Sequence, residues 1–97
     1  MIIRIVKMTF AQQHINAFLK LLEKNKAAIG GFEGCTHLEL WRDKENPNVF
    51  FTYSHWKDES YLEKYRNSEL FNGVWTENKN YFAAKAEAWS VVQVASV

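Results

Sequence analysis

The chain has 97 residues, of which 47% are hydrophobic, 15% aromatic and 24% charged, and this size and composition are those of one folded domain spanning residues 1–97. The formal net charge of +1 disfavours nucleic acid as a partner, and no apolar run approaches the roughly 20 residues of a membrane helix, which disfavours a membrane. Because Cys35 is the only cysteine and no Cys/His zinc motif is present, we expect neither a disulfide nor a metal site and predict a cytoplasmic location.

The first third of the chain has the pattern of a strand followed by a helix. Residues 2–10 alternate, so that both faces of the predicted strand carry apolar groups. Ile15, Phe18 and Ile29 then recur at helical spacing, and the Gly-Gly pair at 30–31 supplies a stop. We therefore expect an amphipathic helix of about four turns after the first strand.

The middle of the chain indicates a β-hairpin. Residues 34–42 and 49–56 are rich in β-branched and aromatic types, and the segment 43–48 between them is a dense turn signal containing Pro47.

Two capping residues predict a broken helix before a final strand. Asp58 and Ser68 can each accept hydrogen bonds from the free amides of a new helix. After the second cap, the residues at helical spacing on one face are Phe71, Val74, Trp75, Asn78 and Phe82. The stretch 88–97 alternates again and is predicted to close the sheet.

This order of elements predicts an α+β fold of the ferredoxin-like β-α-β-β-α-β class, with a four-stranded antiparallel sheet and both helical segments on one face. The sheet residues Leu38, Leu40, Phe50 and Thr52 alternate with Cys35, His37, Trp41, Phe51 and Tyr53, so both faces carry large apolar groups, including the face that no helix covers. A second copy of the chain is the simplest cover for that face, so we expect a homodimer with a two-fold sheet-on-sheet interface.

Three segments resemble the antibiotic biosynthesis monooxygenase family in their order and spacing. They are residues 32–35 after the first helix, residues 53–56 at the end of the third strand, and residues 65–71 at the opening of the last helix. The resemblance extends over nearly the whole chain and implies a dimeric α+β barrel. It also implies a function among those of the family and its relatives, which include cofactor-free quinol or anthrone oxygenases, haem-degrading enzymes and small-molecule isomerases.

The chain departs from the family at two kinds of position. Many members carry histidines at the positions of Tyr65 and Leu70. Haem-degrading relatives supply an axial histidine from the last helix, at the position that Trp75 occupies here. The resemblance therefore implies a reaction that uses neither haem nor those imidazoles, and we expect no cofactor.

The candidate site is an aromatic-lined cavity between the sheet and the helices that would hold a flat aromatic ligand. Its predicted aromatic residues are Tyr53, Trp56, Tyr65, Phe71, Trp75 and Phe82. Core packing is the alternative, and we favour it for Phe71 and Phe82. As a catalytic hypothesis, His55, Tyr53 or Tyr65 would orient or deprotonate a substrate hydroxyl while Trp56 and Trp75 stack on the ring, with Phe71 and His37 as further substrate-binding residues.

His37 and His55 both occupy odd-numbered strand positions, so a suitable hairpin register would place them on one face as proton acceptors near neutral pH. The favoured alternative is that they are solvated or lie at the dimer contact, because local spacing fixes no carboxylate beside either.

The function predicted from these observations is a cofactor-independent monooxygenase acting on a quinol or polyphenol. Such an enzyme needs only a base and a pocket that excludes water, so the lack of a catalytic triad or phosphate loop does not count against it. The alternatives are a non-catalytic dimeric module that binds small molecules and an isomerase of a small carbonyl compound.

Overall fold

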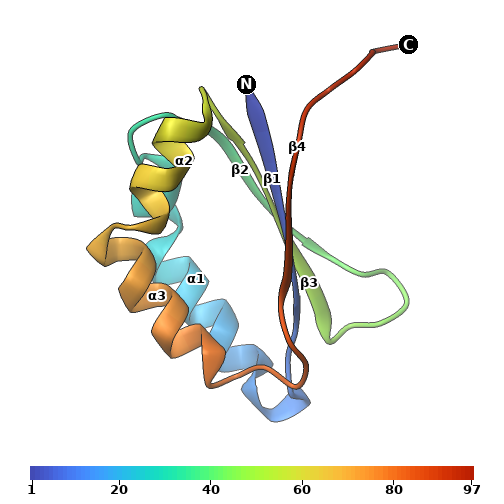
Figure 1. Ribbon diagram of the computed structural model, residues 1–97. Coiled ribbons are helices and arrows are strands. Elements are labelled where there is room, and N and C mark those ends of the chain that lie inside the picture. Colours follow the sequence, from blue (N-terminus) through green and yellow to red (C-terminus); the bar gives the residue numbers. More distant parts are fainter.

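A four-stranded antiparallel sheet and three α-helices form two layers in the computed structural model, which describes residues 1–97 (Figure 1). The elements are β1 (Ile2–Thr9), the short 3-10 helix η1 (Gln12–His14), α1 (Ile15–Gly30), β2 (Cys35–Arg42), β3 (Val49–Trp56), α2 (Glu59–Arg66), α3 (Glu69–Lys79) and β4 (Glu87–Val91). The strand order is β2-β3-β1-β4, and all three helices cover one face of the sheet (Figure 1). The predicted ferredoxin-like α+β fold is confirmed.

The register of the central strands decides which side chains face the helices. β1 pairs with β3 so that Met8 lies opposite Phe50 and Arg4 opposite Ser54. Because successive side chains of a strand point to opposite faces, the even-numbered residues of both strands face the helices and the odd-numbered residues face away. The outer face is left without a covering layer.

The hydrophobic core sits at the end of the molecule where β1 meets the start of α1. Its buried members are Met8, Phe10, Ile15, Phe18 and Phe50. The rings of Phe10 and Phe18 stack with their centroids 4.0 Å apart. Phe82 packs against this cluster, 5.4 Å from Phe10 between centroids, so its side chain belongs to the core, as favoured from the sequence.

Both predicted helix caps are present. Asp58 accepts a hydrogen bond from the backbone N–H of Ser60 at 2.8 Å and begins α2. Ser68 accepts one from the backbone N–H of Phe71 at 3.1 Å and begins α3. These caps satisfy amide groups that would otherwise lack partners, so each helix has a stabilised first turn although the chain changes direction between them.

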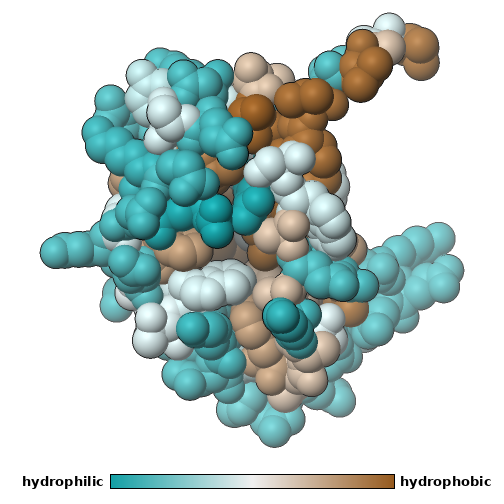
Figure 2. Space-filling model, in the orientation of Figure 1, coloured by the Kyte–Doolittle hydropathy of each residue, from teal (hydrophilic) through white to brown (hydrophobic).

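The last strand is shorter than expected. β4 ends at Val91, which pairs with Ile3 near the start of β1, so beyond it the sheet offers almost no further backbone to pair with. The prediction of a strand over 88–97 is therefore wrong for its second half. Residues 92–97 project from the body of the molecule (Figure 1). Figure 2 shows apolar residues gathered along this C-terminal segment, where Val92 is 60% and Val94 94% exposed.

None of the helices combines the length and the apolar character needed to cross a lipid bilayer.

Candidate functional site

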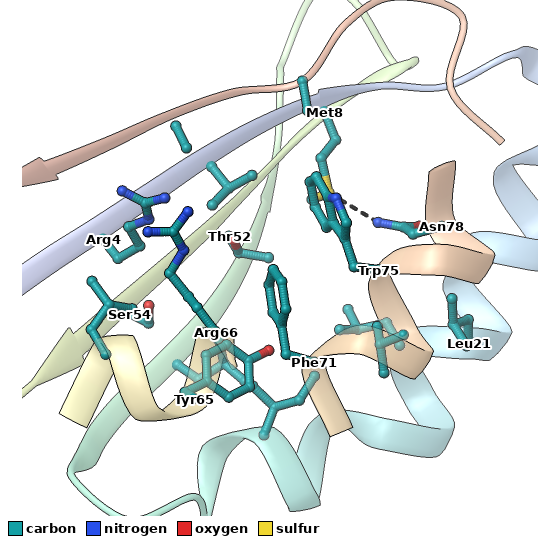
Figure 3. A pocket seen from close by; sticks show the side chains of 18 of the residues that line it. Arg4, Met8, Leu21, Thr52, Ser54, Tyr65, Arg66, Phe71, Trp75 and Asn78 are labelled. Carbon is teal, nitrogen blue, oxygen red and sulfur yellow. Dashed lines mark hydrogen bonds between the residues drawn. The ribbon is translucent and has the colours of Figure 1, made fainter. Parts of the chain in front are cut away.

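A cavity of about 300 Å³ lies between the helix-facing side of the sheet and the three helices (Figure 3). Of its 20 lining residues 15 are hydrophobic, which suits an apolar ligand oriented by a few polar groups. The sheet side of the lining consists of Arg4, Val6, Met8, Leu38, Thr52, Ser54, Trp56 and Ala88, together with Ala86 just before β4. The helices contribute Tyr65, Arg66, Phe71, Trp75 and Asn78 among others.

Four aromatic rings form one continuous wall of the cavity. Trp56 stacks on Tyr65 with centroids 5.0 Å apart, and Tyr65 meets Phe71 edge to face at 5.2 Å. Phe71 and Trp75 are one helical turn apart on α3 and stack at 5.7 Å with 10° between their planes. The Ser68 cap fixes the start of this helix, so it also fixes where the two α3 rings point. Parallel rings of this kind present a flat apolar surface to a planar ligand.

The two ends of the cavity are polar. Figure 3 shows the guanidinium groups of Arg4 and Arg66 close together at one end and the amide of Asn78 at the other. Arg4 Nη1 donates to Ser90 Oγ at 3.0 Å, and Arg66 Nη1 lies 3.1 Å from Glu63 Oε1. Burial, and then the neighbouring charge of Arg66, lower the pKa of Arg4 from its ordinary value.

Asn78 is 4% exposed and has an incomplete set of hydrogen bonds. Its Nδ2 group lies 3.4 Å from Met8 Sδ, a weak acceptor, and its Oδ1 atom has no partner. Buried polar atoms in folded proteins almost always have partners, so this oxygen is an exception: an acceptor that is buried beside the cavity without a hydrogen-bond donor.

Tyr65 is a neutral phenol over the whole physiological pH range. Burial raises its pKa to about 12, and the neighbouring Cys35 adds a smaller effect in the same direction. Its hydroxyl can therefore donate a hydrogen bond to a ligand oxygen and is a poor proton acceptor. No histidine, aspartate or glutamate side chain lines the cavity.

The sequence profile of the family described as antibiotic biosynthesis monooxygenase matches residues 1–74. The chain belongs to the antibiotic biosynthesis monooxygenase family. No curated protein has a matching sequence.

Solved structures share the fold of this family member at low sequence identity. A conserved protein from Methanosarcina mazei is 22% identical, with a TM-score of 0.87 over 93% of this chain and 90% of that one. A structure described as antibiotic biosynthesis monooxygenase is 17% identical, with a TM-score of 0.91 over 98% and 100% of the two chains. A protein from Mycobacterium tuberculosis is 10% identical, with a TM-score of 0.89 over 98% and 96%. At these identities the likeness establishes the fold.

The structure divides the residues that the sequence suggested for the site of this monooxygenase-family chain. Trp56, Tyr65, Phe71 and Trp75 line the cavity. Tyr53, His55 and His37 lie on the opposite face of the sheet, away from the helices. Placing Tyr53 in the cavity was wrong, because it lies three residues before the inward-facing Trp56 and strand side chains alternate. A single bound ligand in the cavity cannot touch both groups.

The outer-face residues form a cluster of their own. His37 lies directly opposite His55 with ring centroids 5.2 Å apart, so the hairpin register is one that places both on the same face. His55 Nε2 lies 2.7 Å from the hydroxyl of Tyr53, on which Trp41 stacks at 4.4 Å. Local spacing does fix a carboxylate beside one histidine, contrary to the prediction: Glu39, two residues along β2, contacts His37 and accepts from Trp41 Nε1.

Three residues at the polar ends of the cavity were not assigned to the site from the sequence: Arg4, Arg66 and Asn78. Arg4 and Asn78 did carry a signal, since each is a polar residue within an otherwise apolar stripe, on β1 and α3 respectively. No signal in the sequence indicated that Arg66 lines the cavity, because a basic residue in the last turn of a helix is common. Its place beside Arg4 depends on how α2 docks on the sheet.

Among family positions that differ here, Trp75 lines the cavity and Leu70 does not. Because no histidine of this chain reaches the cavity, no imidazole is placed there to bind a haem iron.

Proposed function

We propose that this chain is a cofactor-independent monooxygenase that binds a quinol- or polyphenol-type aromatic compound in the cavity between the sheet and the helices. The observation that carries the proposal is the continuous wall of four aromatic rings around a 300 Å³ space, in a member of the antibiotic biosynthesis monooxygenase family. A bicyclic or tricyclic ring fits between such walls.

The proposed reaction balances without a cofactor. A hydroquinone reacts with O₂ to give a hydroxyquinone and water: one oxygen atom enters the ring as a hydroxyl group, the other leaves as water, and the substrate supplies the four electrons. The protein then has to bind the ring, exclude bulk water and favour the electron-rich phenolate form of the substrate.

The two positive charges at one end of the cavity can favour that phenolate. The guanidinium groups of Arg4 and Arg66 stabilise a negative charge on a substrate oxygen, which lowers the pKa of the bound hydroxyl. The neutral hydroxyl of Tyr65 can donate to an oxygen of the same ring. With no carboxylate or imidazole in the lining, no protein base accepts the substrate proton, so the substrate releases that proton to the solvent as it enters and is bound as the phenolate.

Oxygen uptake with naphthohydroquinones, anthrones and catechols, each corrected for spontaneous autoxidation, tests the proposal. Uptake well above background is expected, and Tyr65→Phe is expected to reduce it by about a hundredfold through the loss of a donor to the developing charge. His55→Asn on the outer face is the matched control and should retain activity. Loss of activity in the control alone would place the chemistry on the outer face, where His55 and Tyr53 would then be the acting residues.

A non-catalytic binding module is the second candidate, and the lack of an ionisable base in the cavity lining is the observation that favours it. A binder would be stabilised against heat by an aromatic ligand, consume no oxygen and return the ligand unchanged. The same lack of a base counts against an isomerase of small carbonyl compounds, which needs acid and base groups in its site.

We also propose that the chain works as a homodimer joined through the outer face of the sheet. No helix covers this face (Figure 1), and it leaves Trp41 41% and Trp89 45% exposed. An uncovered apolar sheet face is the kind of surface that a two-fold contact between identical chains buries. His37, His55 and Tyr53 would then lie within the interface.

A further inference from the structure

We infer that residues 92–97, the tail, add an extra strand to the free edge of β2 in a second copy of the chain, with Val92 and Val94 in the groove between β2 and α1 of that copy. The inference rests on the proposed homodimer and names a second contact within it.

The first observation is a strand pattern that has no partner strand. Val92, Gln93 and Val94 continue the alternation of β4, but Val91 already pairs with a residue near the start of β1. Valine favours strands, yet Val94 is almost fully exposed here, on a segment that leads away from the body of the molecule (Figure 1). The tail therefore lacks both a neighbouring strand and a cover for its apolar side chains.

The second observation is a free strand edge. β2 stands at one end of the strand order β2-β3-β1-β4, so no strand of the chain lies along its outer side. Such an edge is a template to which an extended segment adds through main-chain hydrogen bonds. Within one chain β4 lies at the opposite edge of the sheet and the tail leads away from it (Figure 1), so the segment that fits this edge comes from another copy.

The third observation is an apolar groove beside that edge. The groove has a volume of about 320 Å³ between β2 and α1, and its hydrophobic residues are Leu22, Ala27, Leu38 and Leu40. Leu38 and Leu40 lie two residues apart on the helix-facing side of β2, which is also the spacing of Val92 and Val94 along the tail. A tail strand beside β2 would set its two valines against these leucines. Some of the groove residues also line the cavity, so the added strand would border the ligand site.

The proposed sheet-on-sheet dimer can bring the tail and this edge together. When two sheets pack with their strands nearly perpendicular, strands at the corners bend out of one sheet and join the other. β4 is an edge strand, and the tail follows directly from its end. Two-fold symmetry makes the exchange reciprocal, so both β2 edges are covered. Alternation directs the two valines away from the sheet interface, toward α1 of the partner.

Deletion of residues 92–97 tests the contact through the strength of the dimer. The tail is exposed in the single chain, so its removal should leave the fold intact, which thermal unfolding checks. The dissociation constant from sedimentation equilibrium is expected to rise by about tenfold or more, because two buried valines and a row of main-chain hydrogen bonds are lost. Val94→Asp should have a similar effect, and Val94→Ile is the matched control that keeps the apolar contact.

Cross-linking tests which surface the tail contacts. Cys35→Ser removes the only cysteine, and Val94→Cys then places a thiol on the tail. The second thiol is Lys26→Cys, in the groove, or Lys24→Cys, exposed on the same helix and outside the groove. A short bismaleimide at micromolar protein is expected to link two chains at least about tenfold faster with Lys26→Cys, because the added strand raises the effective concentration of the two thiols to about millimolar.

Three results would overturn the inference: an unchanged dissociation constant on deletion, links within a single chain, or links between chains that carry Val94→Cys alone. The last result would place the two tails against each other. If Ile5→Lys, in the middle of the outer face, still separates the copies, the proposed homodimer stands without the exchanged tails. A wild-type protein that is monomeric at micromolar concentration would instead contradict the homodimer itself.

Discussion

Asn78 carries a buried side-chain oxygen that has no hydrogen-bond partner. Replacing a buried amide whose oxygen has no partner by an apolar side chain of similar size should raise the free energy of unfolding by about 1 kcal/mol in the absence of ligand. Asn78→Leu is therefore expected to unfold at higher urea concentration than the wild type. Asn72→Leu, on the same helix but exposed, gives the gain from helix propensity alone. A decrease in stability at position 78 would show that the amide serves the fold.

Tyr65 gives the molecule a predicted loss of stability at alkaline pH. In the unfolded chain its phenol ionises near the ordinary value of 10.0, whereas in the folded protein its pKa is about 12. Between these values the folded state holds a proton that the unfolded state has released, so the stabilisation present below pH 10 is lost as the pH rises toward 12. Urea unfolding across this range should show a steeper fall for the wild type than for Tyr65→Phe. Tyr53→Phe, on the outer face, should keep the wild-type slope, and a slope unchanged in Tyr65→Phe would contradict the burial of the phenol.

At the scale of elements, Gly34 is where the chain passes closest to α2. Its φ angle is +84°, and a Cβ atom added there would overlap the Cβ and Cγ atoms of Tyr61. Gly34→Ala is expected to lower the free energy of unfolding by about 2–4 kcal/mol, through an unfavourable backbone conformation together with overpacking. Gly73→Ala is the matched control: its Cβ would meet nothing within 4 Å in the interior of α3, so a gain of about 0.5–1 kcal/mol is expected. Chemical denaturation measures both, and equal effects would contradict the close approach of α2.

The elements themselves could be predicted because local signals and tertiary pairing agree. Asp58 and Ser68 cap the helices that their sequence positions suggested, and the hairpin has its turn where the polar segment lies. The end of β4 could not be predicted, since alternation continues past Val91 but the partner strand does not. A strand's length depends on the backbone beside it, which is not a local property of the sequence.

The candidate site was predictable only in part, for a geometric reason. Periodicity correctly grouped Phe71 with Trp75, because both lie on one helix. It could not join residues across elements, so Tyr53 was assigned to the cavity although strand alternation directs it to the other face. The approach of Arg66 to Arg4 depends on the docking of α2 and lies beyond what local patterns report.

At the scale of the whole molecule, the uncovered sheet face predicts self-association. Ile5 lies in the middle of that face, paired with Tyr53 on one side and Trp89 on the other. Ile5→Lys should convert the dimer to a folded monomer, because it places a charge in the apolar contact while leaving the helix-covered face unchanged. Lys24→Glu on the exposed side of α1 is the control and should remain dimeric. Light scattering at micromolar concentration measures the oligomeric state, and a monomeric wild-type protein would contradict the proposed interface.

Labelled oxygen tests most directly whether the cavity between the sheet and the helices carries out the proposed monooxygenation. Turnover of a naphthohydroquinone under ¹⁸O₂, followed by mass spectrometry of the product, should show one labelled atom per product molecule. Trp75→Leu, which removes a ring from the cavity wall, should lower the rate of labelling by about tenfold or more, and Trp41→Leu on the outer face should leave it near the wild-type rate. Unlabelled product, or a loss of labelling in Trp41→Leu with none in Trp75→Leu, would contradict the account.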